Sequence, residues 1–149
     1  LTYNLHIMLR FELEKALFEG TISTRELPDA WREASTRIVG YTPKNDREGC
    51  LQDVHWSGGA FGYFPSYCLG NLLAAQLWYR LREDLPDLDK DFESANFQPL
   101  LDWLRTHVHA KGRRLYTLAF TRETTGRELS PEFLVRYLKE RYLPLYTQA

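Results

Sequence analysis

The sequence predicts an all-α protein. In several stretches apolar residues recur at the three- and four-residue spacing of helices, whereas no stretch keeps the strict alternation of a half-buried strand. Residues that cap or stop helices stand at the ends of these stretches. With 149 residues, of which 44% are apolar, the chain is long enough for a sizeable core. We therefore expect residues 1–149 to form a single all-α unit.

Two helices are expected before residue 40. The first covers residues 1–19 and ends at Gly20, and the second starts at the capping box of residues 23–26 and runs to about Val39. In a capping box the serine and the glutamate satisfy each other's backbone N–H groups. The stripe on the first helix consists of Leu5, Met8, Leu9, Glu12, Leu13, Ala16 and Leu17.

A third helix is expected from Pro65 to about Glu83, and it is apolar on nearly all sides. Such a helix needs cover, which predicts surroundings larger than this chain. It also predicts self-association through an interface larger than ~1,000 Å² in total.

The rest of the chain alternates connections and helices. Residues 87–96 are acidic and are expected to connect two helices, of which the second covers residues 97–109. A short helix follows over residues 116–125 and stops at Gly126. The last helix starts at residues 130–131, where serine and proline suit a helix start, and its apolar residues are Phe133, Leu134, Tyr137 and Leu138.

Composition excludes several classes of partner. The 19 Lys and Arg residues and 20 Asp and Glu residues give a net charge of −1 without a long block of one sign, so neither nucleic acid nor an anionic membrane is expected as a partner. No apolar stretch approaches the ~20 residues of a membrane span, and no leader pattern occurs. Two cysteines without a CxxC motif fit a reducing compartment, so we expect a soluble, cytoplasmic protein.

The segment over residues 49–67, GCLQDVHWSGGAFGYFPSY, has the composition of a binding site. Glycines let a ligand approach the backbone closely, while a histidine and tyrosine hydroxyls can donate hydrogen bonds. His55 can act in such a site, or it can be a hydrogen-bonded structural histidine. The aromatic side chains Trp56, Phe61 and Phe64 are expected to serve the core more than a ligand.

The other chemistries have little support in this chain. Asp53 with His55, or His107 with His109, could bind a metal, but each pair is spaced i,i+2 and lacks a third ligand. We therefore expect no metal site from this chain alone, and we expect residues 107–109 to be a helix end. Neither an activated nucleophile nor a phosphate-binding loop has its motif here.

The octapeptide GCLQDVHW at residues 49–56 fits the pattern GxxQDxHW and resembles a signature of the carboxypeptidase Taq family of zinc metallocarboxypeptidases. Residues 62–70 resemble its continuation. Further similar stretches are residues 2–14, 112–116 and 136–139, so the resemblance covers nearly the whole chain.

The resemblance implies the carboxyl-terminal part of a larger, mostly helical, deep-groove zincin-like peptidase that is typically a homodimer. The family's HExxH helix, its downstream Glu ligand and its IRxxAD motif have no counterpart here, and the chain starts just past where the last would end. The resemblance therefore implies zinc, or another divalent metal, in the full-length family enzyme, and this chain alone is expected to be inactive.

The resemblance also implies roles for residues of the 49–67 segment. His55 is expected to donate to a substrate carbonyl, and either Tyr63 or Tyr67 to donate to the oxyanion of the transition state. Asp53 is expected to orient His55 or to cap a helix, and Trp56 and Phe64 to line the groove for peptide substrates. The alternative is a non-catalytic helical module for binding or interaction, either a degenerate relative or the product of a split gene.

Overall fold

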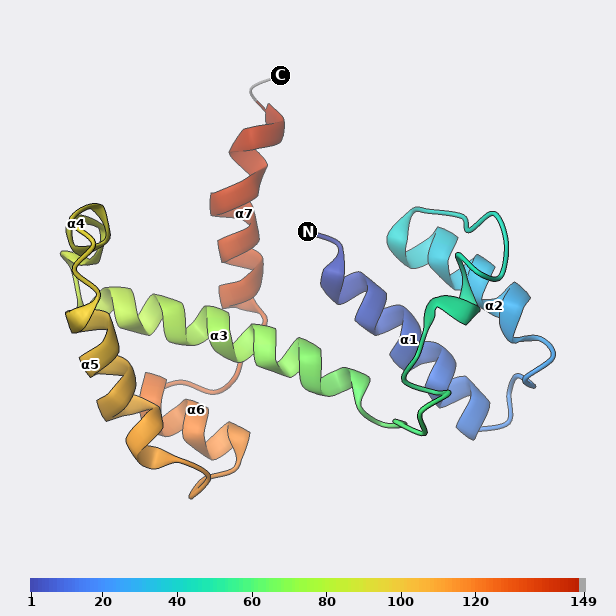
Figure 1. Cartoon of the computed structure of the whole chain (residues 1–149), viewed down its shortest axis with the longest axis horizontal. Helices are drawn as coiled ribbons and strands as arrows, with labels where there is room; N and C mark the ends of the chain where they lie inside the picture. The colour runs from blue at the N-terminus through green and yellow to red at the C-terminus, as the bar shows by residue number, and fades with distance from the viewer. Residues whose placement is uncertain (148–149) are drawn as a thin grey trace. The chain divides into compact units, whose positions relative to one another are not determined.

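A computed structural model describes residues 1–147, and every regular element within this range is a helix (Figure 1). The predicted all-α class is therefore confirmed. The chain divides into two compact units, Leu1–Leu69 and a second that starts at Gly70. A single unit over residues 1–149 stays a prediction. Among the described helices, none is both long and apolar enough to cross a membrane.

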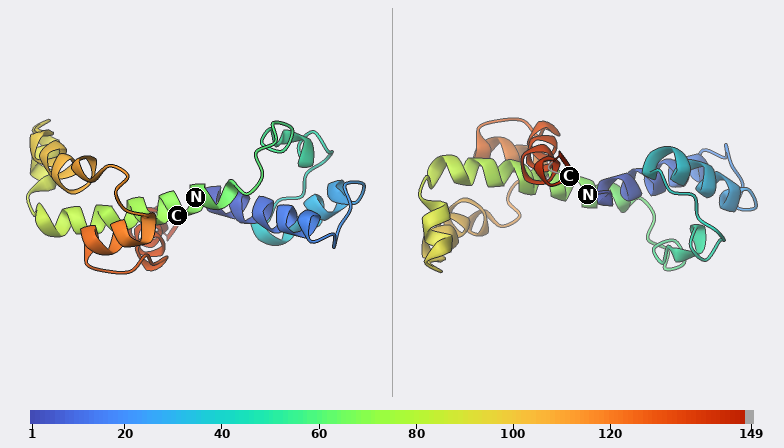
Figure 2. Two further views of the ribbon diagram at one scale, coloured as in Figure 1. Left: turned by 90° about the horizontal axis from the view of Figure 1, so that it is seen from below. Right: turned by 90° about the horizontal axis from the view of Figure 1, so that it is seen from above.

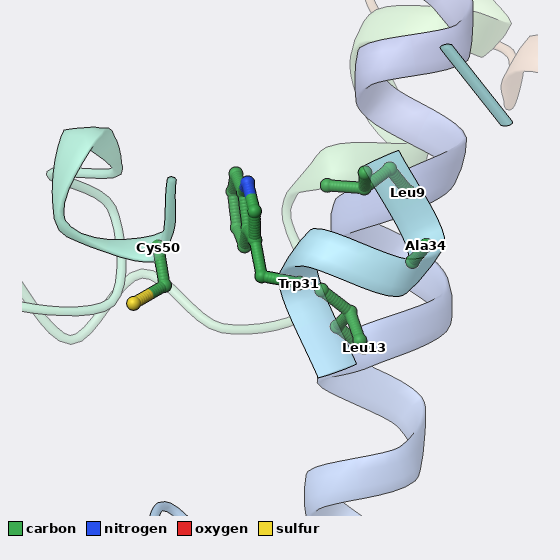
Figure 3. Packing of buried hydrophobic residues seen from close by; sticks show 5 residues of the cluster. All are labelled: Leu9, Leu13, Trp31, Ala34 and Cys50. Atoms are coloured by element: carbon green, nitrogen blue, oxygen red, sulfur yellow. The ribbon is translucent and has the colours of Figure 1, made fainter. Parts of the chain in front are cut away.

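The first unit is built around α1 (Tyr3–Phe18) and α2 (Leu27–Ala34), and α2 continues into the π-helical turn η1 (Ser35–Val39). These elements pack against one another. Their shared core consists of Leu9, Leu13, Trp31, Ala34 and Cys50, and Figure 3 shows the Trp31 indole between Cys50 and the two leucines of α1.

Two expectations for this unit need correction. Met8, placed in the buried stripe of the first helix, is 48% exposed, and Glu14 is buried instead. The capping box does not open the second helix, because α2 begins at Leu27 with Pro28 in its first turn. Glu26 still accepts from the Ser23 N–H at 2.8 Å, so the box closes the preceding turn.

The expected binding segment joins the first core to the third helix. It contains the 3₁₀ turn η2 (Cys50–Gln52) and an irregular loop that leads into α3 (Phe64–Asp84). At Gly62 φ is +71°, a left-handed conformation in which a side chain would be strained. Glycine thus lets the chain turn immediately before α3.

The second unit contains α4 (Leu88–Glu93), α5 (Gln98–His107), the 3₁₀ turn η3 (His109–Lys111), α6 (Thr117–Thr125) and α7 (Glu132–Thr147). Figure 2 shows α4 and α5 beside the end of α3. Leu81, Leu88 and Trp103 form the core there. The acidic connection therefore contains a short helix that was not predicted, because Leu88 buries its side chain in this core.

Candidate functional site

A cavity of about 380 Å³ lies in the first unit, beside the predicted binding segment. Three parts of the sequence line it, namely α1, the end of η2 with the turn after it, and the first residues of α3. The lining residues are Tyr3, His6, Ile7, Arg10, Gln52, Asp53, Val54, His55, Phe64 and Tyr67. Four of the six residues proposed from the sequence thus meet at one cavity, and α1 adds residues that the sequence analysis did not assign.

Asp53 is the buried charge of this cavity, since its side chain is 1% exposed. The Arg10 Nε–H donates to its Oδ2 at 2.7 Å. The backbone N–H of His55 donates to Oδ1 at 2.9 Å, and that of Trp56 approaches the same oxygen at 3.4 Å. An ion pair and two backbone N–H groups therefore replace the water that the carboxylate loses on burial.

His55 is held between Asp53 and aromatic rings. Its Nδ1 lies 3.5 Å from Asp53 Oδ1, and its Nε2 lies 3.2 Å from the Tyr67 hydroxyl. The centroid of the Phe64 ring is 5.0 Å from that of the imidazole. Asp53 thus accepts from the backbone of a turn, not of a helix, and its Oδ1 also lies near the imidazole.

The two candidate tyrosines differ in how they meet the cavity. Tyr67 lines it and contacts His55. Tyr63 does not line it, is 49% exposed, and stacks on the imidazole with ring centroids 6.4 Å apart. Their own rings meet edge to face at 5.1 Å. Burial, and next the neighbouring Tyr63, raises the pKa of the Tyr67 hydroxyl, so Tyr67 keeps its proton at neutral pH.

Among the aromatic residues expected in the core, two lie inside and one does not. Phe64 is 1% exposed, and Trp56 packs against the first core. Phe61 is 48% exposed and touches the Phe18 ring edge to face, so its placement in the core was wrong. Only Phe64 both fills the core and lines the cavity.

The irregular loop is tied to α1 by Glu14. This carboxylate is buried and accepts from the Trp56 indole N–H at 2.8 Å and from the Gly62 N–H at 2.5 Å. A glutamate beside apolar residues looks from sequence like part of a solvated face. The signal that could have revealed it is the spacing of His6, Arg10 and Glu14 at i, i+4 and i+8, which gives one polar stripe on α1.

His6 brings a second imidazole to the cavity. Burial, and next the Arg10 guanidinium, lowers the pKa of His6 below its usual range. The ring is therefore neutral at pH 7, so it donates one hydrogen bond from one nitrogen and accepts one at the other.

The residues at the cavity do not form a metal site. Within residues 1–147, no group of three or more His, Cys, Asp or Glu side chains is placed to hold a metal ion. His107 lies in the second unit, where its ring packs on Trp103 with centroids 4.7 Å apart. As expected from the sequence, residues 107–109 form a helix end, since α5 stops at His107.

The sequence is similar to known peptidases along almost all of its length. Residues 1–142 match the family described as carboxypeptidase Taq (M32) metallopeptidase. Carboxypeptidase 1 of Bacillus subtilis is 47% identical over 146 residues, which are 98% of this chain and 29% of that protein. Thermostable carboxypeptidase 1 of Thermus thermophilus is 46% identical over 145 residues, or 97% of this chain and 28% of that protein.

Solved structures show the same likeness in three dimensions. The M32 carboxypeptidase from Deinococcus radiodurans superposes with a TM-score of 0.93 at 38% identity, over 99% of this chain and 30% of that one. The carboxypeptidase from Pyrococcus furiosus gives a TM-score of 0.90 at 39% identity, over 95% and 28%. This chain thus spans less than a third of the relatives that it matches.

Proposed function

The chain belongs to the carboxypeptidase Taq (M32) family of metallopeptidases, and we propose that it supplies one wall of the peptide-binding groove of such an enzyme. The observation that carries this proposal is the meeting of His55, Tyr67 and Asp53 at one cavity. A peptide backbone offers carbonyl and N–H groups. This wall offers a hydroxyl donor, an imidazole with one donor and one acceptor nitrogen, and apolar surface.

Tyr67 is the better of the two candidates for the oxyanion donor. Its side chain lines the cavity, whereas that of Tyr63 does not, and like any tyrosine hydroxyl it is protonated at neutral pH. A donor held in place before the reaction stabilises the negative charge that develops on a carbonyl oxygen. Tyr63 stacks on His55 and remains the alternative donor.

His55 and its neighbours are proposed to bind the substrate backbone. His55 is expected to donate to a peptide carbonyl, and Asp53 to orient the imidazole. Phe64 gives apolar surface at the cavity. Trp56 is proposed to act indirectly, because its indole is engaged by Glu14 and thereby holds the loop.

The metal of the family does not fit the described residues of this chain. Since residues 1–147 hold no suitable set of ligands, we propose that zinc is bound by other segments of a complete family enzyme, with HExxH among them. The isolated chain is therefore expected to bind peptides weakly and to hydrolyse none. A cytoplasmic location and a homodimer complete the proposal, and the free cysteines Cys50 and Cys68 agree with a reducing compartment.

Two preparations test this proposal together. The first is the isolated chain, assayed on a short blocked peptide with and without added zinc or cobalt, with its metal content measured by elemental analysis. The second is a chimaera in which this chain replaces the 146 matching residues of the Bacillus subtilis carboxypeptidase 1. We expect no activity from the first and carboxypeptidase activity from the second.

Other results would change the account. Activity with bound metal in the isolated chain would mean that its own side chains build a reaction centre. A folded chimaera without activity would favour the alternative, a helical module that binds but takes no part in catalysis.

A further inference from the structure

The two oxygens of Asp53 have different partners, and this difference has a consequence for His55. Oδ2 accepts from the Arg10 Nε–H at 2.7 Å, while Oδ1 faces the imidazole Nδ1 at 3.5 Å. Nδ1 is shielded from solvent and has no hydrogen-bond partner among residues 1–147. The carboxylate oxygen is thus the charged atom that Nδ1 meets.

This arrangement favours one tautomer of the neutral imidazole. An unprotonated Nδ1 would bring its lone pair close to a negatively charged oxygen, whereas a protonated Nδ1 brings the positive end of an N–H close to it. With the proton on Nδ1, Nε2 is unprotonated and accepts from the Tyr67 hydroxyl at 3.2 Å. The Nδ1–H group then faces an acceptor oxygen, and the Nε2 lone pair faces a hydroxyl donor.

Arg10 holds Oδ2 of Asp53 in this orientation, while the backbone N–H groups of His55 and Trp56 donate to Oδ1. The Arg10 Nη1–H donates to the His6 carbonyl at 3.0 Å, and its guanidinium lies over the Trp31 ring at 4.9 Å. These contacts fix the plane of the guanidinium, so that its Nε–H can donate to Oδ2 of Asp53. Oδ1 is left turned toward the imidazole.

We propose that Arg10 is a positioning residue that sets the tautomer of His55 through Asp53. The importance of this tautomer for peptide binding rests on the proposed function. In the neutral state Nε2 is the acceptor nitrogen, to which either the Tyr67 hydroxyl or a peptide N–H can donate. For His55 to donate to a peptide carbonyl, Nε2 must first take up a proton from water, and the resulting imidazolium keeps its Nδ1–H toward Asp53.

The test is ¹⁵N NMR of the imidazole rings in the uniformly labelled chain, without substrate. Protonated and unprotonated ring nitrogens have well separated ¹⁵N shifts. Among the four histidines, the signals of His55 are identified because they are absent from the spectrum of His55→Gln. Spectra across a pH titration give the neutral form at the alkaline plateau. We expect the Nδ1–H tautomer to exceed the other by about tenfold or more in the unaltered chain.

Arg10→Gln is expected to reduce this excess about tenfold, and Arg10→Lys to reduce it less, because lysine keeps the charge without the planar donor group. Arg37→Gln is the control, since Arg37 pairs with the exposed Glu12 on α1 and does not line the cavity. Backbone amide spectra show whether each variant keeps its fold.

Two results would overturn the proposal. One is an Nε2–H tautomer in the unaltered chain, which needs no variant to fold. The other is an unchanged tautomer in a folded Arg10→Gln. Neither result touches the peptidase proposal, because no substrate is present, and an inactive chimaera would in turn leave the tautomer measurement valid.

Discussion

Arg10 and Glu14 stand one turn apart on α1 and hold two different points of the same loop. Arg10 pairs with Asp53 at the start of the loop, whereas Glu14 accepts from the Gly62 N–H at its end. The candidate site is therefore built by a helix and a loop together. A rigid helix on one side fixes the geometry of a loop that has little regular structure of its own.

The Arg10–Asp53 pair is expected to be important for stability. Asp53→Asn leaves a guanidinium that is only 14% exposed without its counter-charge, so we expect the free energy of unfolding to fall by about 3 kcal/mol. Urea unfolding gives this value. The control is Glu12→Gln, which removes an exposed ion pair to Arg37 and should cost less than about 1 kcal/mol. Equal losses in the two variants would mean that burial of the first pair has no special effect.

Glu14 is expected to keep the loop closed. Glu14→Gln replaces the two acceptor oxygens of the carboxylate by one carbonyl oxygen and one NH2 group, which cannot accept. One of the two N–H donors therefore loses its partner, at a cost of about 1–3 kcal/mol. Hydrogen exchange should speed up at the Gly62 amide and at the Trp56 indole. Glu19→Gln, in an exposed pair with Lys15, is the control and should leave both rates unchanged. Unchanged exchange in Glu14→Gln would show that the loop needs no anchor on α1.

The lowered pKa of Asp84 predicts that the protein loses stability in acid. Burial alone would raise its pKa, but hydrogen bonds from the Trp103 indole and from Arg80 outweigh burial, and the pKa of this carboxyl is lowered. The contribution is complete above the unfolded pKa of about 3.9 and is lost as pH falls through the lower native pKa.

This contribution can be measured by urea unfolding at pH 6 and at pH 3. Asp84→Asn should lose less stability between these two pH values than the unaltered chain does. The same loss in both proteins would show that Asp84 does not hold its proton more weakly in the folded state.

The raised pKa of Tyr79 predicts that the protein loses stability in alkali. Burial, followed by the hydrogen bond to Glu140, raises the pKa of Tyr79 from 10.0 to about 12. Between these values the folded chain keeps a proton that the unfolded chain has lost, so stability falls as pH rises. Tyr79→Phe should make this fall shallower by up to about 1.4 kcal/mol per pH unit. Denaturation at pH 9 to 11 checks it, and Tyr116→Phe, at a tyrosine that is 92% exposed, should keep the full slope.

The sequence predicted the helices other than α4 and the segment of the candidate site, but not the partners of that segment. Apolar spacing locates α1 and α3, and the glycines and aromatic residues of the loop set it apart. Arg10 and Glu14 look from sequence like a solvated face, because burial of a charge depends on where a distant segment folds. Leu88 was missed for a related reason, since one apolar residue in an acidic stretch has no periodicity.

The central claim is that the wall formed by His55 and Tyr67 acts in peptide cleavage, and kinetics of the chimaera test it most directly. We expect Tyr67→Phe to reduce kcat at least about 100-fold, with KM changed by less than about threefold, because the lost donor acts in the transition state. Tyr116→Phe is the matched control and should leave both constants unchanged. If Tyr63→Phe shows the loss instead, the donor is the outer tyrosine. If neither variant differs from Tyr116→Phe, the claim that this wall takes part in catalysis is contradicted.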